Sequence, residues 1–461
     1  LKYRNDKATY FRVTDEFYKD RDLFYNDARV KHMKIDFPVQ GYSYNYSLTK
    51  KFEDVKYFTS IYFNDEFPVI SKKIQVSVPS WLDLELKEMN FEGHTIIKSK
   101  TVDPKTKMTV YKYEFNDIDP VYNEENSPGR TYLYPHILVL AKSYEFDGKK
   151  TNLFNSTADL YKWYKSLVDD MKDDPEQLKT KVTELTSSAK SDEEKIKNIY
   201  YWVQDNIRYI AFEDGIAGFK PDVSQNVFNK RYGDCKGMAN LIKQMLVLAG
   251  FDARLTWIGT KHIAYDYSIA SLSVDNHMIC TVYYKGKPIF LDGTEKFNSF
   301  GEYAERIQNK EVMIEDGDKY IILKVPTSQE IENKETFNAK LKIMDEKLIG
   351  TCQRTFTGES RSQFQNIYNS FESSKKAEAL EGFLSGSDKN NHITEIKTSD
   401  LKNRDQQLTI DYVLDSSNRV SMFDEEMYLN FEFMNEYKGM TFKDRKTDYE
   451  FDYKTLYESE I

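Results

Sequence analysis

Cys235, His277 and Asp292 are the side chains whose types and order could carry out covalent chemistry. Before a thiol can attack an amide carbonyl, it needs a neighbouring base and a third group that orients that base. A cysteine, a histidine and an acid can fill these three roles. The set therefore predicts acyl transfer with Cys235 as nucleophile, His277 as base and Asp292 as the orienting acid.

Cys235 lies at the predicted start of an amphipathic helix. In the segment Arg-Tyr-Gly-Asp-Cys-Lys-Gly, Asp234 is expected to start the helix and Lys236 to face solvent. Gly250 supplies a C-terminal cap. The unpaired N–H groups and the dipole of a helix N-terminus favour a thiolate and a developing oxyanion. The apolar side of this helix recurs at Met238, Leu241, Ile242, Met245 and Leu248.

His277 and Asp292 lie on two consecutive predicted strands, 277–284 and 289–292. Between them, Lys285-Gly-Lys287 predicts a hairpin turn. A further strand is expected over 253–258. Because antiparallel neighbours bring side chains on one face together, the hairpin can place the imidazole within hydrogen-bonding reach of the carboxylate.

Helical patterns precede the cysteine segment over residues 158–171 and 178–185, and again from Ser191. The sequence Ser191-Asp-Glu-Glu194 predicts a capping box, in which each terminal side chain bonds the other residue's backbone N–H. The apolar stripe that follows is Ile196, Ile199, Tyr200, Val203 and Ile207.

These segments together resemble the transglutaminase-like superfamily, a branch of papain-like folds with the triad order Cys, His, Asp. The resemblance covers about residues 191–295, and the combination is far more specific than any single piece. It implies that Cys235, His277 and Asp292 are the catalytic residues. Gly237 departs from the pattern, because relatives commonly have an acidic residue there. The residues that carry the resemblance are 199–209, 231–246, 249–254, Asn276-His277 and Phe290-Leu-Asp-Gly-Thr294.

The sequences on both sides of this core have patterns typical of β-strands. Residues 73–79 and 109–115 alternate apolar and polar side chains, as do 339–343 and 408–413, with one helical insert over 364–384. The predicted class is α+β, a papain-like transglutaminase core between two β-rich domains. The expected domains are 1–155, 156–328 and 329–461. The flanks also resemble the β-rich domains that accompany this core in bacterial proteins.

His262 is the competing base, but its context, Thr-Lys-His-Ile-Ala, predicts the start of a loop. A zinc site from Cys235, His277 and Asp292 is open by ligand type. It lacks the close ligand spacing typical of such sites. No metal and no organic cofactor is implied.

Three further residues are expected to be structural. Cys280 lies three positions after His277, on the opposite strand face, which predicts a packed core thiol. Cys352 is expected to be buried in the last domain. Trp202 is expected to pack between helices. Some relatives use a tryptophan to bind the oxyanion, but that role is not assigned here.

The bulk composition excludes several classes of protein. The net charge of −10 argues against a nucleic-acid partner, and three cysteines cannot form a disulfide framework. No apolar run approaches the roughly 18 residues of a membrane span. The chain begins with Leu1, and we expect that a leader has been removed and that the protein is periplasmic or surface-exposed. A cytoplasmic location is left open.

The sequence thus predicts thiol-dependent acyl transfer on peptide, protein or cell-wall amide substrates. Hydrolysis, as in a cysteine protease or amidase, is favoured over transfer to an amine, which would cross-link proteins. A non-catalytic surface binding protein that keeps the core as a scaffold is the third hypothesis. The sequence does not determine the oligomeric state.

Overall fold

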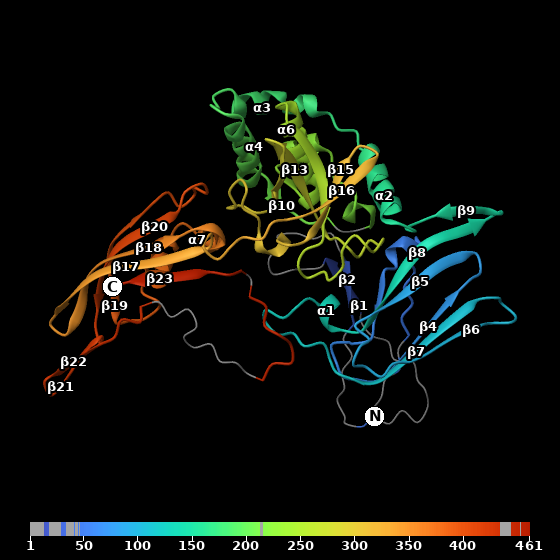
Figure 1. The fold of residues 1–461 in the computed structure, drawn as a ribbon, viewed down its shortest axis with the longest axis horizontal. Helices are drawn as coiled ribbons and strands as arrows, with labels where there is room; N and C mark the ends of the chain where they lie inside the picture. Colours follow the sequence, from blue (N-terminus) through green and yellow to red (C-terminus); the bar gives the residue numbers. More distant parts are fainter. Residues whose placement is uncertain are drawn as a thin grey trace.

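The computed structural model describes residues 13–17, 29–33, 41, 45, 47–212, 215–433, 444–451 and 453–461. The predicted α+β class is confirmed: a core of helices packed on a sheet is accompanied by additional β-rich regions. Figure 1 shows this core between an N-terminal β-rich region and a C-terminal one.

A five-stranded antiparallel sheet of order β14-β13-β12-β15-β16 forms the centre of the core. β13 and β14 form the predicted hairpin, with Lys285 and Gly286 at positive φ in its turn. Cys280 pairs with Leu291 in this hairpin, so the chain beyond β14 runs alongside the start of β13. The strands are β12 (Asp252–Ile258), β13 (His277–Tyr284), β14 (Lys287–Leu291), β15 (Glu311–Asp316) and β16 (Lys319–Lys324).

The helices of the core are α2 (Thr157–Asp169), α3 (Lys179–Thr186), α4 (Asp192–Asn206), α5 (Ser224–Lys230) and α6 (Cys235–Leu248). α6 packs directly on β12 and β13. Met238, Leu241 and Ile242 are fully buried against Cys280 and Val282. Removal of this apolar stripe from water holds α6, and with it Cys235, on the sheet.

The start of α4 differs in one detail from the predicted capping box. The Ser191 hydroxyl accepts a hydrogen bond from the Glu194 N–H at 3.2 Å, as predicted. The Glu194 carboxylate, however, accepts from the Lys190 N–H at 2.7 Å. The reciprocal half of the prediction was therefore wrong, because the chain before α4 brings the preceding N–H into reach.

Short strands and 3-10 helices lie between the longer elements of the chain. β10 (Arg208–Tyr209) pairs in parallel with β11 (Tyr232–Gly233), which ties the end of α4 to the residues just before Cys235. The 3-10 helices are η1 (Val55–Tyr57), η2 (Pro175–Leu178), η3 (Gly215–Gly218) and η4 (Glu305–Ile307).

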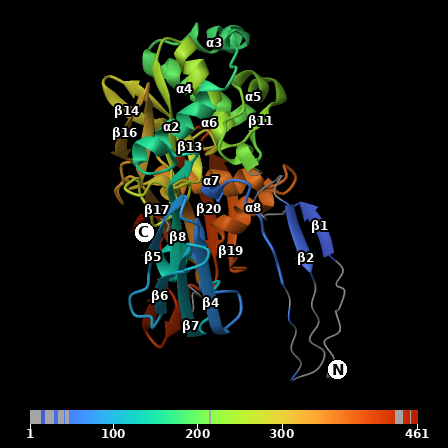
Figure 2. The same cartoon turned by 90° about the vertical axis from the view of Figure 1, so that its right-hand side faces the viewer.

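Besides the two-stranded sheet β1-β2, the described part of the N-terminal β-rich region has two larger sheets, of order β3-β8-β5 with β9 on β8, and β4-β7-β6. They pack around Phe63, Phe115 and Ile137. Figure 2 shows β4, β6 and β7 at the end of the molecule opposite α3. The elements are β1 (Val13–Phe17), β2 (Arg29–Met33), β3 (Ser60–Tyr62), β4 (Val69–Val78), β5 (Leu82–Met89), β6 (Ile97–Val102), β7 (Thr109–Ile118), α1 (Arg130–Leu133), β8 (His136–Phe146) and β9 (Lys149–Asn152).

In the described residues, the C-terminal β-rich region has a two-stranded sheet, β21-β22, and a five-stranded sheet of order β19-β20-β18-β17-β23. The predicted helical insert is present as two helices, α7 and α8, which pack on this sheet through Phe364 and Leu380. The elements are β17 (Lys334–Met344), β18 (Lys347–Phe356), α7 (Gly358–Ser370), α8 (Lys376–Leu384), β19 (Asn391–Thr398), β20 (Leu408–Ser416), β21 (Val420–Phe423), β22 (Glu426–Leu429) and β23 (Leu456–Glu460).

Residues 444–451 connect the two β-rich regions (Figure 1). The Lys446 and Thr447 N–H groups donate to the Glu124 carboxylate at 2.9 and 2.8 Å. The chain then continues to β23, which pairs in parallel with β17. The domain boundaries proposed from the sequence stay a prediction. Within the part of the chain that is described, no helix has the length and apolarity to cross a membrane.

The packing of α6 predicts a large cost for truncating its buried side. Leu241→Ala removes a side chain that is 0% exposed, and we expect the free energy of unfolding to fall by about 2–5 kcal/mol. Val247→Ala on the same helix, where the side chain is 47% exposed, is the matched control and should cost no more than about 0.5 kcal/mol. Urea denaturation measures both. Equal costs would contradict the packing described for α6.

Candidate active site

Cys235 is the first residue of α6, as predicted, and is 7% exposed. Asp234 caps the helix, because its carboxylate accepts from the Gly237 N–H at 2.8 Å. The structure also explains Gly237: an added Cβ would lie 3.0 Å from a Val227 methyl group and 3.5 Å from the Asp234 carboxylate. A glycine therefore lets α5 and the Asp234 cap pack closely against the start of α6.

His277 begins β13, and Asp292 directly follows β14. The His277 Nε2 lies 2.8 Å from Asp292 Oδ2, and the two residues are 7% and 4% exposed. The other carboxylate oxygen, Oδ1, accepts from the Thr294 N–H at 3.1 Å and from the Thr294 hydroxyl at 2.7 Å. These bonds fix the carboxylate, which in turn fixes the plane of the imidazole.

Cys235 and His277 share a hydrogen bond and influence each other's charge. Burial alone would raise the pKa of the Cys235 thiol, but the His277 imidazolium lowers it below its ordinary value. Burial would lower the pKa of His277, yet the Asp292 carboxylate raises it to about 9. The charges of His277 and Arg306 hold the pKa of Asp292 well below its usual range against the effect of burial. The arrangement favours a thiolate–imidazolium pair at neutral pH.

Arg306, in η4, is a site residue that the sequence did not reveal. Its Nη2 donates to Asp292 Oδ2 at 2.7 Å and to the Thr294 hydroxyl at 2.8 Å, and lies 3.3 Å from His277 Nε2. Its Nε donates to Glu295 at 2.7 Å. The positive charge therefore stabilises ionised Asp292 while opposing protonation of His277. No motif surrounds Arg306, so only the fold relates it to the hairpin.

Lys236 is buried, and the expectation that it faces solvent was wrong. Its side chain is 9% exposed and forms an ion pair with the Asp234 carboxylate. Its Nζ also donates to the Phe212 carbonyl at 3.4 Å. A charge is tolerated here because it is paired and hydrogen-bonded. The helix start thus contains a cation beside the nucleophile.

The other residues singled out in the sequence lie elsewhere. His262 lies in a turn, and its backbone carbonyl accepts a hydrogen bond from the Thr131 hydroxyl at 2.8 Å. Cys280 is fully buried among the residues under α6, and Cys352 is buried in the C-terminal sheet, as expected. Trp202 packs against Phe228, which joins α4 to α5. Within the described ranges, no cluster of three or more acidic, histidine or cysteine side chains is arranged to hold a metal.

His277 lies between two cavities. One, of ≈ 340 Å³, is also lined by Cys235 and Lys236. The other, of ≈ 840 Å³, borders Arg306 and Thr294 and is also lined by residues of the C-terminal β-rich region such as Asn369. His277 therefore borders one cavity of the core and one cavity that the core shares with the C-terminal β-rich region.

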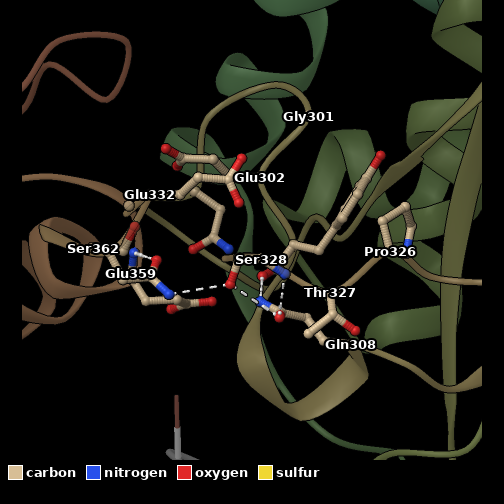
Figure 3. A pocket seen from close by; sticks show the side chains of 13 residues that line it. Gly301, Glu302, Gln308, Pro326, Thr327, Ser328, Glu332, Glu359 and Ser362 are labelled. Carbon is tan, nitrogen blue, oxygen red and sulfur yellow. Dashed lines mark hydrogen bonds between the residues drawn. The ribbon is translucent and has the colours of Figure 1, made fainter. Parts of the chain in front are cut away.

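A third cavity, of ≈ 260 Å³, lies where the core meets α7 (Figure 3). Glu302, Glu332 and Glu359 line it, and burial raises the pKa of Glu359 to about 8. None of Cys235, His277 and Asp292 lines this cavity. We assign it no part in the chemistry.

The comparisons with known proteins agree with this core. Residues 179–288 match the family model of the transglutaminase-like superfamily. This segment contains Cys235 and His277 and ends before Asp292. No curated protein sequence matches the chain.

Two solved structures show a distant likeness. One, described as a candidate protease from Parabacteroides distasonis, is 12% identical with a TM-score of 0.47, over 78% of this chain and 69% of the other. The second, described as a candidate cysteine protease from Cytophaga hutchinsonii, is 11% identical with a TM-score of 0.23, over 51% of this chain and 74% of the other.

The charge pair predicts an unusual pH dependence for alkylation of Cys235. Because the imidazolium lowers the pKa of this thiol, iodoacetamide should still modify Cys235 below pH 7, where a free cysteine with a pKa of about 8.5 reacts slowly. Mass spectrometry of the modified peptide measures the rate. Cys280 and Cys352, whose pKa values burial raises to about 12, are internal controls that should stay unmodified. If the alkylation rate of Cys235 had the same pH dependence as that of a free thiol, this would argue against the thiolate–imidazolium pair.

Arg306→Gln should raise the pKa of His277 above its value of about 9, since the guanidinium opposes imidazole protonation. NMR titration of labelled histidine measures this shift directly. Arg254→Gln is the matched control, because Arg254 pairs with Asp252 and Asp316 at the other end of β12. A pKa that is unchanged or lowered by Arg306→Gln would contradict the electrostatic role given to Arg306.

Proposed function

The chain contains a transglutaminase-like domain, and on that basis we propose that it is a thiol enzyme that hydrolyses peptide or amide bonds through Cys235, His277 and Asp292. The observation that carries this proposal is the hydrogen-bonded series from the thiol at the start of α6, through the imidazole, to the carboxylate. Three groups in this order are what nucleophilic attack on an amide requires.

The first half-reaction forms a thioester. The Cys235 thiolate attacks the carbonyl carbon, and the electron pair of the C=O bond moves to oxygen. The Cys235 N–H, at the first position of α6, points away from the helical hydrogen-bond ladder and stabilises that oxyanion. His277 then donates its proton to the amide nitrogen, the C–N bond breaks, and the amine departs. Asp292 holds the imidazole in place throughout.

The second half-reaction releases the acyl group. A water molecule attacks the thioester carbonyl, His277 takes its proton, and the Cys235 thiolate leaves as the carboxylic acid forms. The polar cavity beside His277 and Arg306 supports hydrolysis, because it gives water a route to the imidazole. Transfer to a primary amine would use the same thioester and differs only in the nucleophile.

Cys235→Ala should lower amide turnover by about a thousandfold or more, because the nucleophile is lost. Cys352→Ala is the matched control and should leave turnover close to wild type, since that thiol lies in the C-terminal sheet. The assay follows peptide cleavage by mass spectrometry, with and without a labelled primary amine to separate hydrolysis from transfer. Turnover that survives Cys235→Ala would exclude the proposed mechanism.

A further inference from the structure

The cavity of ≈ 340 Å³ next to the Cys235 thiol is built mainly from apolar side chains of separate elements. Tyr164 of α2 stacks on Trp257 of β12, with ring centroids 5.1 Å apart. A cavity of this size and lining can hold a group as large as an amino-acid side chain. The apolar side chains around it are Tyr164, Phe219, Trp257, Leu272 and Met278.

One carboxylate, that of Asp275, also lines this cavity. The Tyr164 hydroxyl donates to its Oδ1 at 2.7 Å, and the Tyr267 hydroxyl donates to its Oδ2 at 3.0 Å. Both donors are uncharged. Lys236 borders the same cavity, but its charge is paired with Asp234. In the described part of the chain, Asp275 therefore has two oriented hydrogen bonds and no ion pair.

A carboxylate in such surroundings lacks a compensating charge. Burial raises the pKa of Asp275 to about 7, although the two tyrosine hydroxyls act in the opposite direction. Each carboxylate oxygen can accept a second hydrogen bond, so Asp275 has acceptor capacity left after binding the tyrosines. A bound cation would thus gain from the remaining acceptor capacity of the Asp275 carboxylate.

We propose that this cavity, which we call the ammonium cavity (Tyr164, Phe219, Trp257 and Asp275), binds a primary ammonium group of the substrate. Asp275 is its counter-charge and determines specificity without taking part in proton transfer. The inference rests on the proposed function, because it names the substrate class: amides whose acyl side carries a protonated amine near the scissile carbonyl. An α-amino group and a lysine-type side chain are two sources of this chemistry.

The first test needs no turnover. n-Butylammonium chloride, used as the probe, should slow iodoacetamide alkylation of Cys235 in a saturable manner, because it occupies the cavity that adjoins the sulfur. 1-Pentanol, a neutral molecule of similar size, should protect far less when sodium chloride matches the ionic strength. Asp275→Asn removes the charge with little change in shape and should weaken protection by butylammonium about tenfold or more.

Asp266→Asn is the matched control for this substitution. Asp266 lies in the same loop before β13, accepts a hydrogen bond from the Ser268 N–H at 2.9 Å, and does not line the cavity. Protection should be unchanged in this variant. Equal protection by pentanol and butylammonium in the wild-type protein would overturn the proposal, as would undiminished protection in Asp275→Asn. The comparison of butylammonium with pentanol uses only the wild-type protein, so it tests the proposal even if Asp275→Asn does not fold.

The second test identifies the source of the ammonium. Peptide pairs that differ only in charge, a free or acetylated α-amine and a lysine or norleucine side chain, are compared by kcat/KM. In at least one pair, the charged peptide should have the higher kcat/KM. Asp275→Asn should abolish that preference, whereas Asp266→Asn, which lies outside the cavity, should keep it. A preference that persists in Asp275→Asn would overturn the proposal. Protection by butylammonium without cleavage of any peptide would count against the proposed hydrolysis and not against the cavity.

Discussion

The register of the β13–β14 hairpin is the constraint on which the candidate site depends. Pairing of Cys280 with Leu291 brings the residue after β14 next to the start of β13, where His277 lies. A slip of one residue would turn the side chains of one strand to the other face of the sheet. Gly293 adds a second constraint, because an added Cβ would lie 2.8 Å from Ile242 of α6. The segment that contains Asp292 therefore packs closely against α6, which begins at Cys235.

This close packing places charges in a series of alternating sign. The Cys235 thiolate, the His277 imidazolium, the Asp292 carboxylate and the Arg306 guanidinium follow one another, and Glu295 accepts from Arg306 at the end. Because Cys235, His277 and Asp292 are buried, their charges act on one another more strongly than they would in water. Removing one member leaves the next without its partner, which is costly for a buried charge. The reactivity of the thiol is thus a property of the whole series.

The C-terminal β-rich region lines part of the space beside this series of charges. One cavity beside His277 belongs to the core, whereas the other is lined partly by α7 and by residues near Arg404. Arg404 forms an ion pair with Asp205 at the end of α4, and Tyr201 of the same helix donates to Asp405 at 2.6 Å. The C-terminal β-rich region is therefore attached to the helix that packs on the Asp292 loop. Residues of this region, such as Asn369 and Arg404, form part of the wall of the polar cavity beside His277.

The sequence by itself determined the helix that begins at Cys235, the His277 hairpin and the order of the three candidates, because helical periodicity and turn residues are local signals. It misplaced Lys236, since a lysine beside a glycine gives no sign that a buried carboxylate will pair with it. It gave no indication of Arg306 or of the Asp275 carboxylate with its two tyrosines, which come from elements distant along the chain. Only the tertiary structure decided these contacts, because they depend on how α2, η4 and the loop before β13 pack against one sheet.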